Sequence, residues 1–384
     1  MHIAFNGWFW DLEHTGSGQY VRQLVRYLRK ADAQLQISLV MPPHNPRPQG
    51  VPEGVAIYPT GERSKSSKLG KVWFEQWLFP RAVSALKADL AHVPYWGSPL
   101  SCSAPVVVSV LDVIPVLYPL YSMGMFNRLY LSLVQTAART AEQIISISQT
   151  SKLDIEYWLN IPKERISVTY LAPDDVYHPK LGAEKDAVVR QKYQLPDEYI
   201  LYLGGFDKRK RLTDLVDAYD YVKLASDANL PIVLAGKKPT PSPLFPDLDA
   251  YARERDSQDY LQWIGYVDEA DKPALYRMAK LFVYPSEYEG FGLPPLEAMA
   301  CGTPVVAADS IINDEILESA AYLVDSPRTM AAAIIALILQ KPFHEAMVNQ
   351  GLAHVTKYNW RKTAKATLAV YQHVLSKRSS HKPR

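Results

Sequence analysis

Two glutamates, Glu289 and Glu297, enclose a glycine-rich turn and the start of a predicted helix. The residues between them read Gly-Phe-Gly-Leu-Pro-Pro-Leu and follow an apolar run that predicts a strand. Glycine lets a backbone turn tightly and approach a ligand, and a helix that begins there offers N–H groups to an anion. Ionised carboxylates repel phosphate but accept hydrogen bonds from hydroxyl groups. A ligand that offers both phosphate and vicinal hydroxyls is a nucleotide sugar. The alternative is that both glutamates are surface residues at the start of a helix.

A second segment adds positive charge to this interpretation. An apolar strand-like run ends at Leu203, Gly204 and Gly205 follow as a turn, and residues 208–211 are four consecutive cations. Cations at the start of a helix oppose its dipole, so an anionic ligand explains them better than helix stability does. A solvated run of charges remains the alternative.

The string from Glu289 to Glu297 resembles the E-x7-E motif of the retaining glycosyltransferases of family 4, which have the GT-B fold. The resemblance implies that Glu289 contacts hydroxyls of the transferred sugar and that Glu297 binds the ribose of the donor. It also implies that the amides of Gly290, Phe291 and Gly292 line the sugar and the diphosphate.

The glycine turn and the cations that follow it fit the same family. Arg209 and Lys210 match its basic pair, which implies that they neutralise the leaving diphosphate, a task that other transferases give to a divalent metal. Gly204 and Gly205 match its glycine pair, but many relatives have arginine in place of Gly205. The resemblance therefore implies a diphosphate site with one cation fewer than in many relatives.

Other glycines and one valine match the family less specifically. Gly236 lies in an Ala-Gly-Lys element, and Val267 ends a segment whose backbone usually reads the nucleobase. Gly16 and Gly18 precede a predicted helix, in a loop that reaches the donor phosphates and the acceptor in GT-B enzymes. Without a third glycine this pair is a poor dinucleotide fingerprint. A plain strand end or helix-entry turn explains each of these positions about as well.

The predicted acceptor side departs from the family pattern. Leu111 occupies the position of a family histidine that contacts the sugar, while the following Asp112 is retained. Asp112 either orients the acceptor or caps a turn. His92, at the end of another strand, could replace the missing histidine, although a lone histidine there is more often structural. Further candidates for acceptor contact are Tyr95, Trp96 and His14.

The elements that position these residues alternate between short apolar runs and longer helical patterns, which predicts parallel βαβ units. A helical pattern covers 72–87, and prolines and polar residues near 173–192 indicate a linker. Predicted strands are 2–5, 36–41, 90–93, 106–111, 143–147, 166–170, 199–203, 232–235, 261–263, 281–283 and 304–307.

We therefore expect an α/β protein with the GT-B fold, in which two Rossmann-like domains face a central cleft. Residues 1–178, with a returning helix over 361–378, form the expected acceptor domain, and 186–360 form the expected nucleotide-sugar donor domain. Ligands of such sheets bind at the carboxyl ends of the strands.

Composition narrows the choice of partners. The 42 Lys+Arg residues nearly balance 40 Asp+Glu residues, which argues against a nucleic-acid ligand. Cys102 and Cys301 lie far apart and the nine histidines include no HExxH, so we expect neither a metal nor a cofactor beyond the donor substrate. Asp247 and Asp249 fit a D-x-D metal motif, but the prolines before them favour an acidic helix start.

The expected reaction moves a hexose from a nucleotide-diphosphate sugar to a hydroxyl of a glycan or lipid-linked saccharide, with retention at the anomeric carbon. No side-chain nucleophile is evident, which favours attack on the face that the leaving group departs from. A GT-B sugar-nucleotide epimerase or phosphorylase, or an inactive sugar-binding relative, remains the alternative.

The chain shows neither a signal peptide nor an apolar run of bilayer length, so we expect a cytoplasmic protein. Lys65, Lys68, Lys71 and the basic C-terminal tail could also contact the inner face of an anionic membrane. A solvated basic surface is the alternative explanation for these residues.

Overall fold

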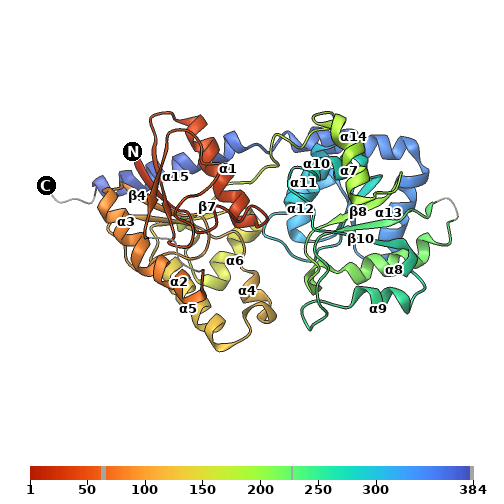
Figure 1. Ribbon diagram of the computed structural model, residues 1–384, viewed down its shortest axis with the longest axis horizontal. Coiled ribbons are helices and arrows are strands. Elements are labelled where there is room, and N and C mark those ends of the chain that lie inside the picture. Colours follow the sequence, from red (N-terminus) through yellow and green to blue (C-terminus); the bar gives the residue numbers. More distant parts are fainter. Residues whose placement is uncertain (62–65, 226–227, 381–384) are drawn as a thin grey trace. The chain divides into compact units, whose positions relative to one another are not determined.

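The computed structural model describes residues 1–61, 66–225 and 228–380, and at 379 and 380 the backbone alone. Two compact units make up the chain, one formed by Met1–Leu171 with the chain from Asn359 onward, the other by Ala172–Tyr358. Each unit is a parallel sheet flanked by helices (Figure 1). Lys65 and the end of the basic tail, two of the expected membrane contacts, lie outside the described residues.

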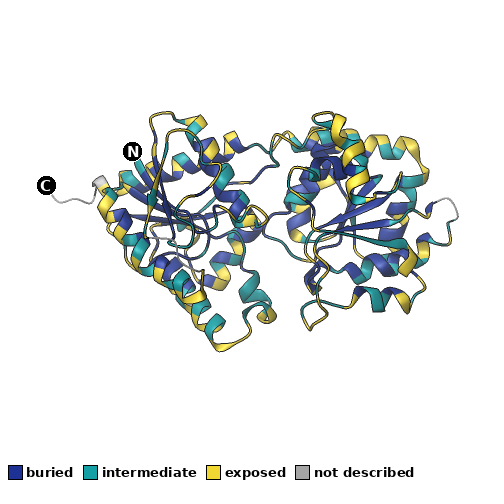
Figure 2. Cartoon of the chain, viewed as in Figure 1, coloured by how far each residue is buried: buried dark blue, intermediate teal, exposed yellow. Residues whose placement is uncertain are grey.

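The first sheet is parallel, and its inner strands are fully buried and rich in Val, Ile and Leu, as a sheet covered on both faces requires. Figure 2 shows these strands in dark blue. Across the sheet the order is β3 (Val55–Pro59), β2 (Gln36–Met41), β1 (His2–Asn6), β4 (Leu90–Val93), β5 (Val106–Ser109), β6 (Gln143–Ser146) and β7 (Ile166–Val168).

The helices of the first unit include a π-helical segment, η1, where sequence periodicity predicts a single helix over 72–87. The predicted returning helix is α15, which begins at Trp360 and packs its indole against Tyr20 and Tyr27 of α1. The helical elements are α1 (Gly16–Ala31), α2 (Lys68–Trp73), η1 (Phe74–Leu78), α3 (Phe79–Leu86), α4 (Ile114–Leu117), η2 (Pro119–Ser122), α5 (Met125–Thr140), α6 (Gln149–Leu159), η3 (Lys163–Arg165) and α15 (Trp360–Ser380).

His92 joins the sheet to the returning helix. Its ring is fully buried, with Nδ1 at 2.5 Å from the Tyr371 hydroxyl and Nε2 at 2.9 Å from the Ser109 hydroxyl. Burial lowers the pKa of His92 to about 3, so the imidazole is neutral at physiological pH. The acceptor contact predicted for His92 is therefore corrected, because both ring nitrogens are engaged inside the first unit.

The second sheet is also parallel, and its core includes Ile200, Leu234 and Ile334, all fully buried. Across it the order is β10 (Leu261–Gly265), β9 (Ile232–Ala235), β8 (Ile200–Leu203), β11 (Leu281–Tyr284), β12 (Val305–Ala308) and β13 (Tyr322–Val324). Its helical elements are η4 (Ala183–Lys185), α7 (Asp186–Tyr193), η5 (Lys208–Lys210), α8 (Leu212–Val222), α9 (Leu248–Arg253), η7 (Gln258–Tyr260), α10 (Lys272–Met278), α11 (Leu293–Ala300), α12 (Ile311–Leu317), η8 (Glu318–Ala320), α13 (Pro327–Leu339) and α14 (Lys341–Val355).

Both sheets reverse their strand order at one place. In the first unit the chain leaves β1 toward β2 and β3, then returns to β4 on the other side of β1. In the second unit it leaves β8 toward β9 and β10, then returns to β11 on the other side of β8. The loops after the two neighbouring strands diverge at such a switch point and leave room for a ligand.

Within the described ranges, no single helix has the length and apolar character to cross a bilayer. α13 and the stretch Lys341–Arg378, bent by 102° relative to each other, reach that length and apolar character only as a pair.

Gly18 allows α1 to contact the loop before it. A Cβ on Gly18 would lie 2.1 Å from the carbonyl oxygen of Leu12, whereas a Cβ on Gly16 would meet nothing within 4 Å. We expect Gly18→Ala to lower the free energy of unfolding by about 2 kcal/mol or more, and Gly16→Ala to change it by less than about 0.5 kcal/mol. Urea unfolding monitored by circular dichroism measures the free energy of unfolding of both variants. Equal values for Gly18→Ala and Gly16→Ala would contradict this account of Gly18.

Candidate functional site

The loops after β8 and β11 bring together the charged residues that the sequence singles out. Glu289, in the loop after β11, pairs through Oε1 with the guanidinium of Arg209 at 2.6 Å and with the ammonium of Lys210. Ser286 donates its hydroxyl to the same oxygen. Arg209 also approaches Asp207, with Nε 3.4 Å from Oδ1. All of these charged side chains are largely buried, and we call Asp207, Arg209, Lys210 and Glu289 the charge cluster.

The charge cluster keeps its central carboxylate ionised. Burial alone would raise the pKa of Glu289, but the charges of Lys210 and Arg209, with hydrogen bonds from Lys210 and Ser286, lower it to about 2. Two cations and two carboxylates balance within the cluster. An arriving diphosphate would therefore compete with Glu289 for Arg209 and Lys210.

The four-cation run does not form a single basic stripe. Arg209 and Lys210 are buried beside Glu289, whereas Lys208 is exposed and Arg211 pairs with Asp214. Arg211 adopts a left-handed conformation with φ of 48° and precedes α8, so the cations lie in the turn before the helix. The cations therefore still lie at the positive end of the α8 dipole, where Arg209 and Lys210 are offset by Glu289 and Arg211 by Asp214.

The backbone between the two glutamates turns tightly just before α11. Gly292 has φ of 95°, which favours glycine, and the helix then begins at Leu293. Pro294 and Pro295 lack an N–H, so within the first turn of α11 only Leu293 and Leu296 have N–H groups, and further backbone donors to an anion would come from the preceding loop. The stretch with that capacity includes Gly290 and Phe291, as the family resemblance implies.

Glu297 has partners of its own. Its carboxylate is buried in α11 and accepts a hydrogen bond of 3.0 Å from the Tyr276 hydroxyl. Burial raises the pKa of Glu297 to about 7, although the charge of Lys272 acts to lower it. A ribose hydroxyl would donate to the ionised form, so titration of Glu297 bears directly on ligand binding.

Four further donor-site candidates lie where loops after β8, β9 and β10 converge. A Cβ on Gly236 would lie 2.7 Å from the carbonyl oxygen of Gly204, so the two loops pack backbone to backbone. The Gly236 amide also donates to the carbonyl of Gly265 at 2.8 Å. Gly205 accepts a hydrogen bond from the Tyr202 hydroxyl, and Val267 is buried just beyond β10.

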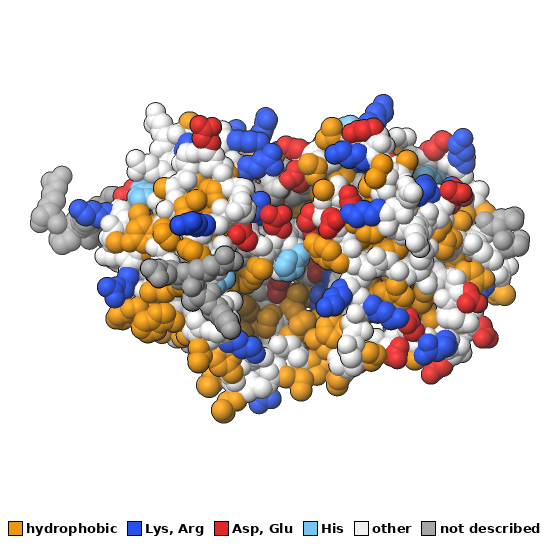
Figure 3. Space-filling model, in the orientation of Figure 1, with side chains coloured by type: hydrophobic (Ala, Val, Ile, Leu, Met, Phe, Trp, Pro, Cys, Tyr) orange, Lys and Arg blue, Asp and Glu red, His pale blue; other side chains and the backbone are white. Residues whose placement is uncertain are grey.

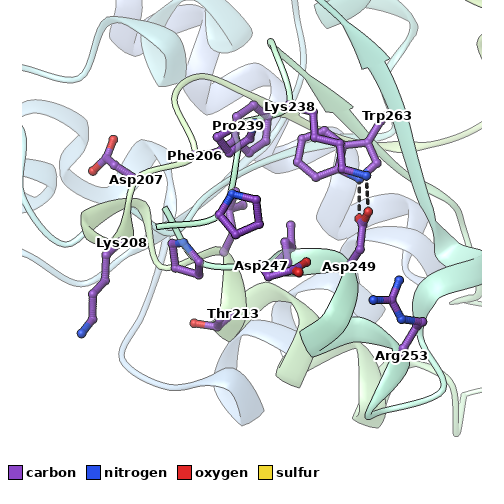
Figure 4. A pocket seen from close by; sticks show the side chains of 14 residues that line it. Phe206, Asp207, Lys208, Thr213, Lys238, Pro239, Asp247, Asp249, Arg253 and Trp263 are labelled. Atoms are coloured by element: carbon purple, nitrogen blue, oxygen red, sulfur yellow. Dashed lines mark hydrogen bonds and ion pairs between the residues drawn. The ribbon is translucent and has the colours of Figure 1, made fainter. Parts of the chain in front are cut away.

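A cavity of about 360 Å³ lies beside these loops on the α8 and α9 side (Figure 4). Lys208 belongs to its wall rather than to the charge cluster. Asp247 caps α9 by accepting from the Ala250 amide at 3.0 Å, and Asp249 accepts from the Trp263 indole at 2.8 Å and from Lys238. The acidic pair thus starts a helix, as predicted, and each carboxylate has protein partners.

A second cavity, of about 480 Å³, lies at the switch point of the first unit. Four predicted residues line it, namely Gly16, Tyr95, Trp96 and Asp112, together with Leu111. Gly18 and His14 are absent from that wall; Gly18 is buried and His14 is exposed elsewhere.

The polar groups of this cavity have distinct local roles. Asp112 accepts from the Ile114 amide at 2.9 Å, so it caps the turn into α4 while it lines the cavity. Among the described residues the buried indole N–H of Trp96 has no hydrogen-bond partner. Such an unpaired buried donor favours a ligand acceptor at the wall.

Sequence reasoning missed the ion pair beneath the cavity. Lys71 lies over the rings of Tyr95 and Tyr130, about 5 Å from each centroid, and 3.6 Å from Glu75. Glu75 is fully buried in η1 and also accepts from the Tyr130 hydroxyl at 2.9 Å. Burial raises the pKa of Glu75 to about 7, against the lowering effect of Lys71. The one available signal was a single acidic residue inside an apolar helical pattern.

Comparison with known proteins identifies the family. A model described as Glycosyltransferase Family 4 matches residues 14–175, and one described as Glycosyl transferases group 1 matches residues 186–354. The chain belongs to glycosyltransferase family 4. The family 4 resemblance noted for the segment from Glu289 to Glu297 is confirmed, and the two matches fall in different units of the structure.

Curated relatives of this family 4 chain include two O-antigen enzymes. "O-antigen chain mannosyltransferase B" of Escherichia coli is 33% identical over 237 residues, which is 61% of this chain and 61% of that protein. "O-antigen chain mannosyltransferase RfbU" of Salmonella typhimurium is 26% identical over 59% of each chain. The chain thus matches about six-tenths of the length of each of these two relatives.

Solved structures confirm the GT-B fold of this family 4 chain. Sucrose-phosphate synthase from Thermosynechococcus elongatus has a TM-score of 0.74 at 21% identity, covering 98% of this chain and 99% of that one. WaaG, a glycosyltransferase involved in lipopolysaccharide biosynthesis, has a TM-score of 0.71 at 14% identity, covering 96% and 99%. At such identities the likeness concerns the fold.

The raised pKa of Glu297 predicts pH-dependent binding of nucleotide. If the ionised carboxylate accepts from the ribose, the dissociation constant of a nucleoside diphosphate should fall about tenfold between about pH 6 and pH 8, as Glu297 loses its proton near pH 7. Glu297→Gln should bind more weakly and lose this component of the pH profile. Calorimetric titration across the range measures both proteins, and identical profiles would remove Glu297 from the binding site.

Proposed function

We propose that the protein is a retaining glycosyltransferase that moves a mannosyl group from a nucleotide-diphosphate donor to a hydroxyl of a glycan acceptor. The charge cluster is the observation that carries this proposal, because it holds two buried cations and an ionised carboxylate at a switch point. Family membership supports the reaction class. The printed names of the relatives, mannosyltransferases of O-antigen chains, support the sugar and the glycan acceptor.

Charge separation is the step that this arrangement serves. As the glycosidic bond to phosphate breaks, negative charge grows on the diphosphate and positive charge grows on the sugar ring. Arg209 and Lys210 are already desolvated, so contact with the departing phosphate would replace their pairing with Glu289 and would not have to strip water from them. Amides of the loop before α11 would add donors on the same side.

Glu289 is suited to hold hydroxyl groups rather than to attack the sugar. Its Oε1 accepts from Arg209, Lys210 and Ser286 in the ligand-free chain, which lowers its nucleophilicity. Once a diphosphate draws the cations away, the carboxylate can accept from hydroxyls of the transferred sugar. We therefore favour attack by the acceptor hydroxyl on the face from which the diphosphate departs.

The cavity of the first unit is the acceptor site in this proposal. Trp96 lines the cavity and offers a ring on which a sugar ring can stack, and its indole offers a donor to a hydroxyl oxygen. Asp112 lines the same cavity and could orient the attacking hydroxyl. The leucine at position 111 leaves that wall without the imidazole of other family members.

Lys210 should be essential to transfer, and its replacement still leaves Glu289 paired with Arg209. Lys210→Met keeps the length of the side chain, and Glu289 keeps its contacts with Arg209 and Ser286. We expect kcat/KM for transfer to fall by about 10²–10³ through loss of leaving-group stabilisation. Release of nucleoside diphosphate from guanosine and uridine diphosphate sugars, with an oligomannoside acceptor, measures the rate.

Lys208→Met is the matched control, because it removes a cation of the same run that is exposed and lines the neighbouring cavity. It should retain nearly all activity. A panel of nucleotide sugars identifies the donor by thermal shift, since a ligand at 100 times its dissociation constant stabilises the fold by about 2.7 kcal/mol. Full turnover by Lys210→Met would contradict the proposed reaction.

A further inference from the structure

Large apolar side chains gather on the surface of the first unit over α2, η1, η2 and α5. Figure 3 shows hydrophobic side chains over this part of the molecule. Met125 is 80% exposed and Trp73 56% exposed, and the rings of Trp73 and Trp77 stack with centroids 5.6 Å apart. We call this set the apolar face. It comprises Leu69, Trp73, Trp77, Leu120, Met123, Met125 and Leu129.

The apolar face is continuous between its helices. Lys68 of α2 donates to the side-chain oxygen of Asn127 in α5 at 3.2 Å, and its ammonium lies over the Phe126 ring. These contacts place the two helices side by side. Large apolar side chains that are exposed together on adjoining elements, rather than scattered singly, mark an interaction site.

Charge indicates the partner. Residues 66–88 contain one acidic residue, Glu75, which is fully buried, and residues 113–141 contain no Asp or Glu. Exposed basic residues accompany the apolar face, namely Lys68 of α2, Arg128 of α5, and Arg81 of the adjoining α3, whose guanidinium lies over the Trp77 ring. Exposed tryptophan, aliphatic and basic side chains without exposed carboxylates fit the interface of an anionic bilayer. Tryptophan in particular prefers the level of the lipid headgroups.

The same elements line the acceptor cavity with their other residues. On α5, Asn127, Tyr130 and Leu131 face the cavity while Met125 and Leu129 are exposed. On α2, Lys71 lines the cavity and Leu69 is exposed. The segment at η2 repeats this division, with Tyr121 and Ser122 at the cavity and Leu120 and Met123 exposed.

We propose that the apolar face docks the protein on an anionic membrane surface and thereby holds the acceptor cavity beside the lipid headgroups. The acceptor that fits this placement is amphiphilic, with a saccharide in the cavity and a lipid portion in the bilayer. The docking stands on the surface itself, whereas the acceptor class rests on the proposed function. A membrane-bound acceptor then meets the cavity without leaving its bilayer.

Vesicle flotation tests the docking with the full-length chain. Vesicles of phosphatidylcholine with roughly a third phosphatidylglycerol supply the anionic surface, and phosphatidylcholine alone supplies the neutral one. The variant Met125→Glu/Leu129→Glu places two carboxylates at exposed positions outside the cavity wall. We expect its partition onto anionic vesicles to fall at least about tenfold, because apolar contact is lost and repulsion is added.

Leu224→Glu is the matched control, since Leu224 is 84% exposed and belongs to the second unit. It should float with anionic vesicles like the unchanged protein, and the unchanged protein should bind neutral vesicles only weakly. Equal flotation of all three proteins, or no flotation by any, would overturn the docking. The docking would also be overturned if the unchanged protein is a dimer without lipid and the double variant is a monomer, because the apolar face would then join two copies of the chain.

Activity separates this inference from the proposed function. With a soluble oligomannoside the double variant should turn over like the unchanged protein, while with an acceptor anchored in anionic vesicles its rate should drop in proportion to its lost binding. If the double variant no longer floats with vesicles but keeps full activity on the anchored acceptor, the inference that the acceptor is amphiphilic would be overturned. Absence of transfer in every protein would contradict the proposed function while leaving docking to be judged by flotation.

Discussion

The pairing of one buried carboxylate with two buried cations is the constraint on which the second unit depends. Removing Glu289, Arg209 or Lys210 from water is costly, and each is tolerable only because the others are within contact distance. The reversal of strand order between β8 and β11 places their loops side by side. The fold therefore holds charges that have little reason to be buried together except a charged ligand.

A comparable arrangement organises the first unit with different chemistry. Its switch point lies between β1 and β4, and the loops there open onto a cavity with aromatic walls and a buried ion pair beneath, Lys71 with Glu75. Cations beside a carboxylate suit a diphosphate, whereas ring faces and a lone indole N–H suit a saccharide. The two units thus divide donor and acceptor binding in the way that the proposed reaction requires.

Local patterns in the sequence predicted most of the fold and part of the candidate site. The inner strands were predictable because a sheet covered on both faces favours apolar runs. β3 and β13 were missed because most of their residues are exposed or half-buried at sheet edges. Spacing around Glu289 and the basic run singled out three members of the charge cluster, but it predicted neither their ion pairing nor the part of Asp207. The contact of His92 with Tyr371 joins residues remote in sequence, so no local pattern could reveal that His92 is structural. The contact of Gly18 with Leu12 was likewise invisible, since it depends on how a loop folds back on α1.

Binding of a free nucleoside diphosphate to Glu289→Gln, compared with the unchanged protein by calorimetry, tests the central claim most directly. If Glu289 holds Arg209 and Lys210 until a diphosphate replaces it, the amide variant should bind the nucleoside diphosphate at least as tightly as the unchanged protein. It should also lose the added affinity that the sugar of an intact donor provides, and with it transfer. Weaker binding of the nucleoside diphosphate, together with unimpaired transfer, would contradict the account.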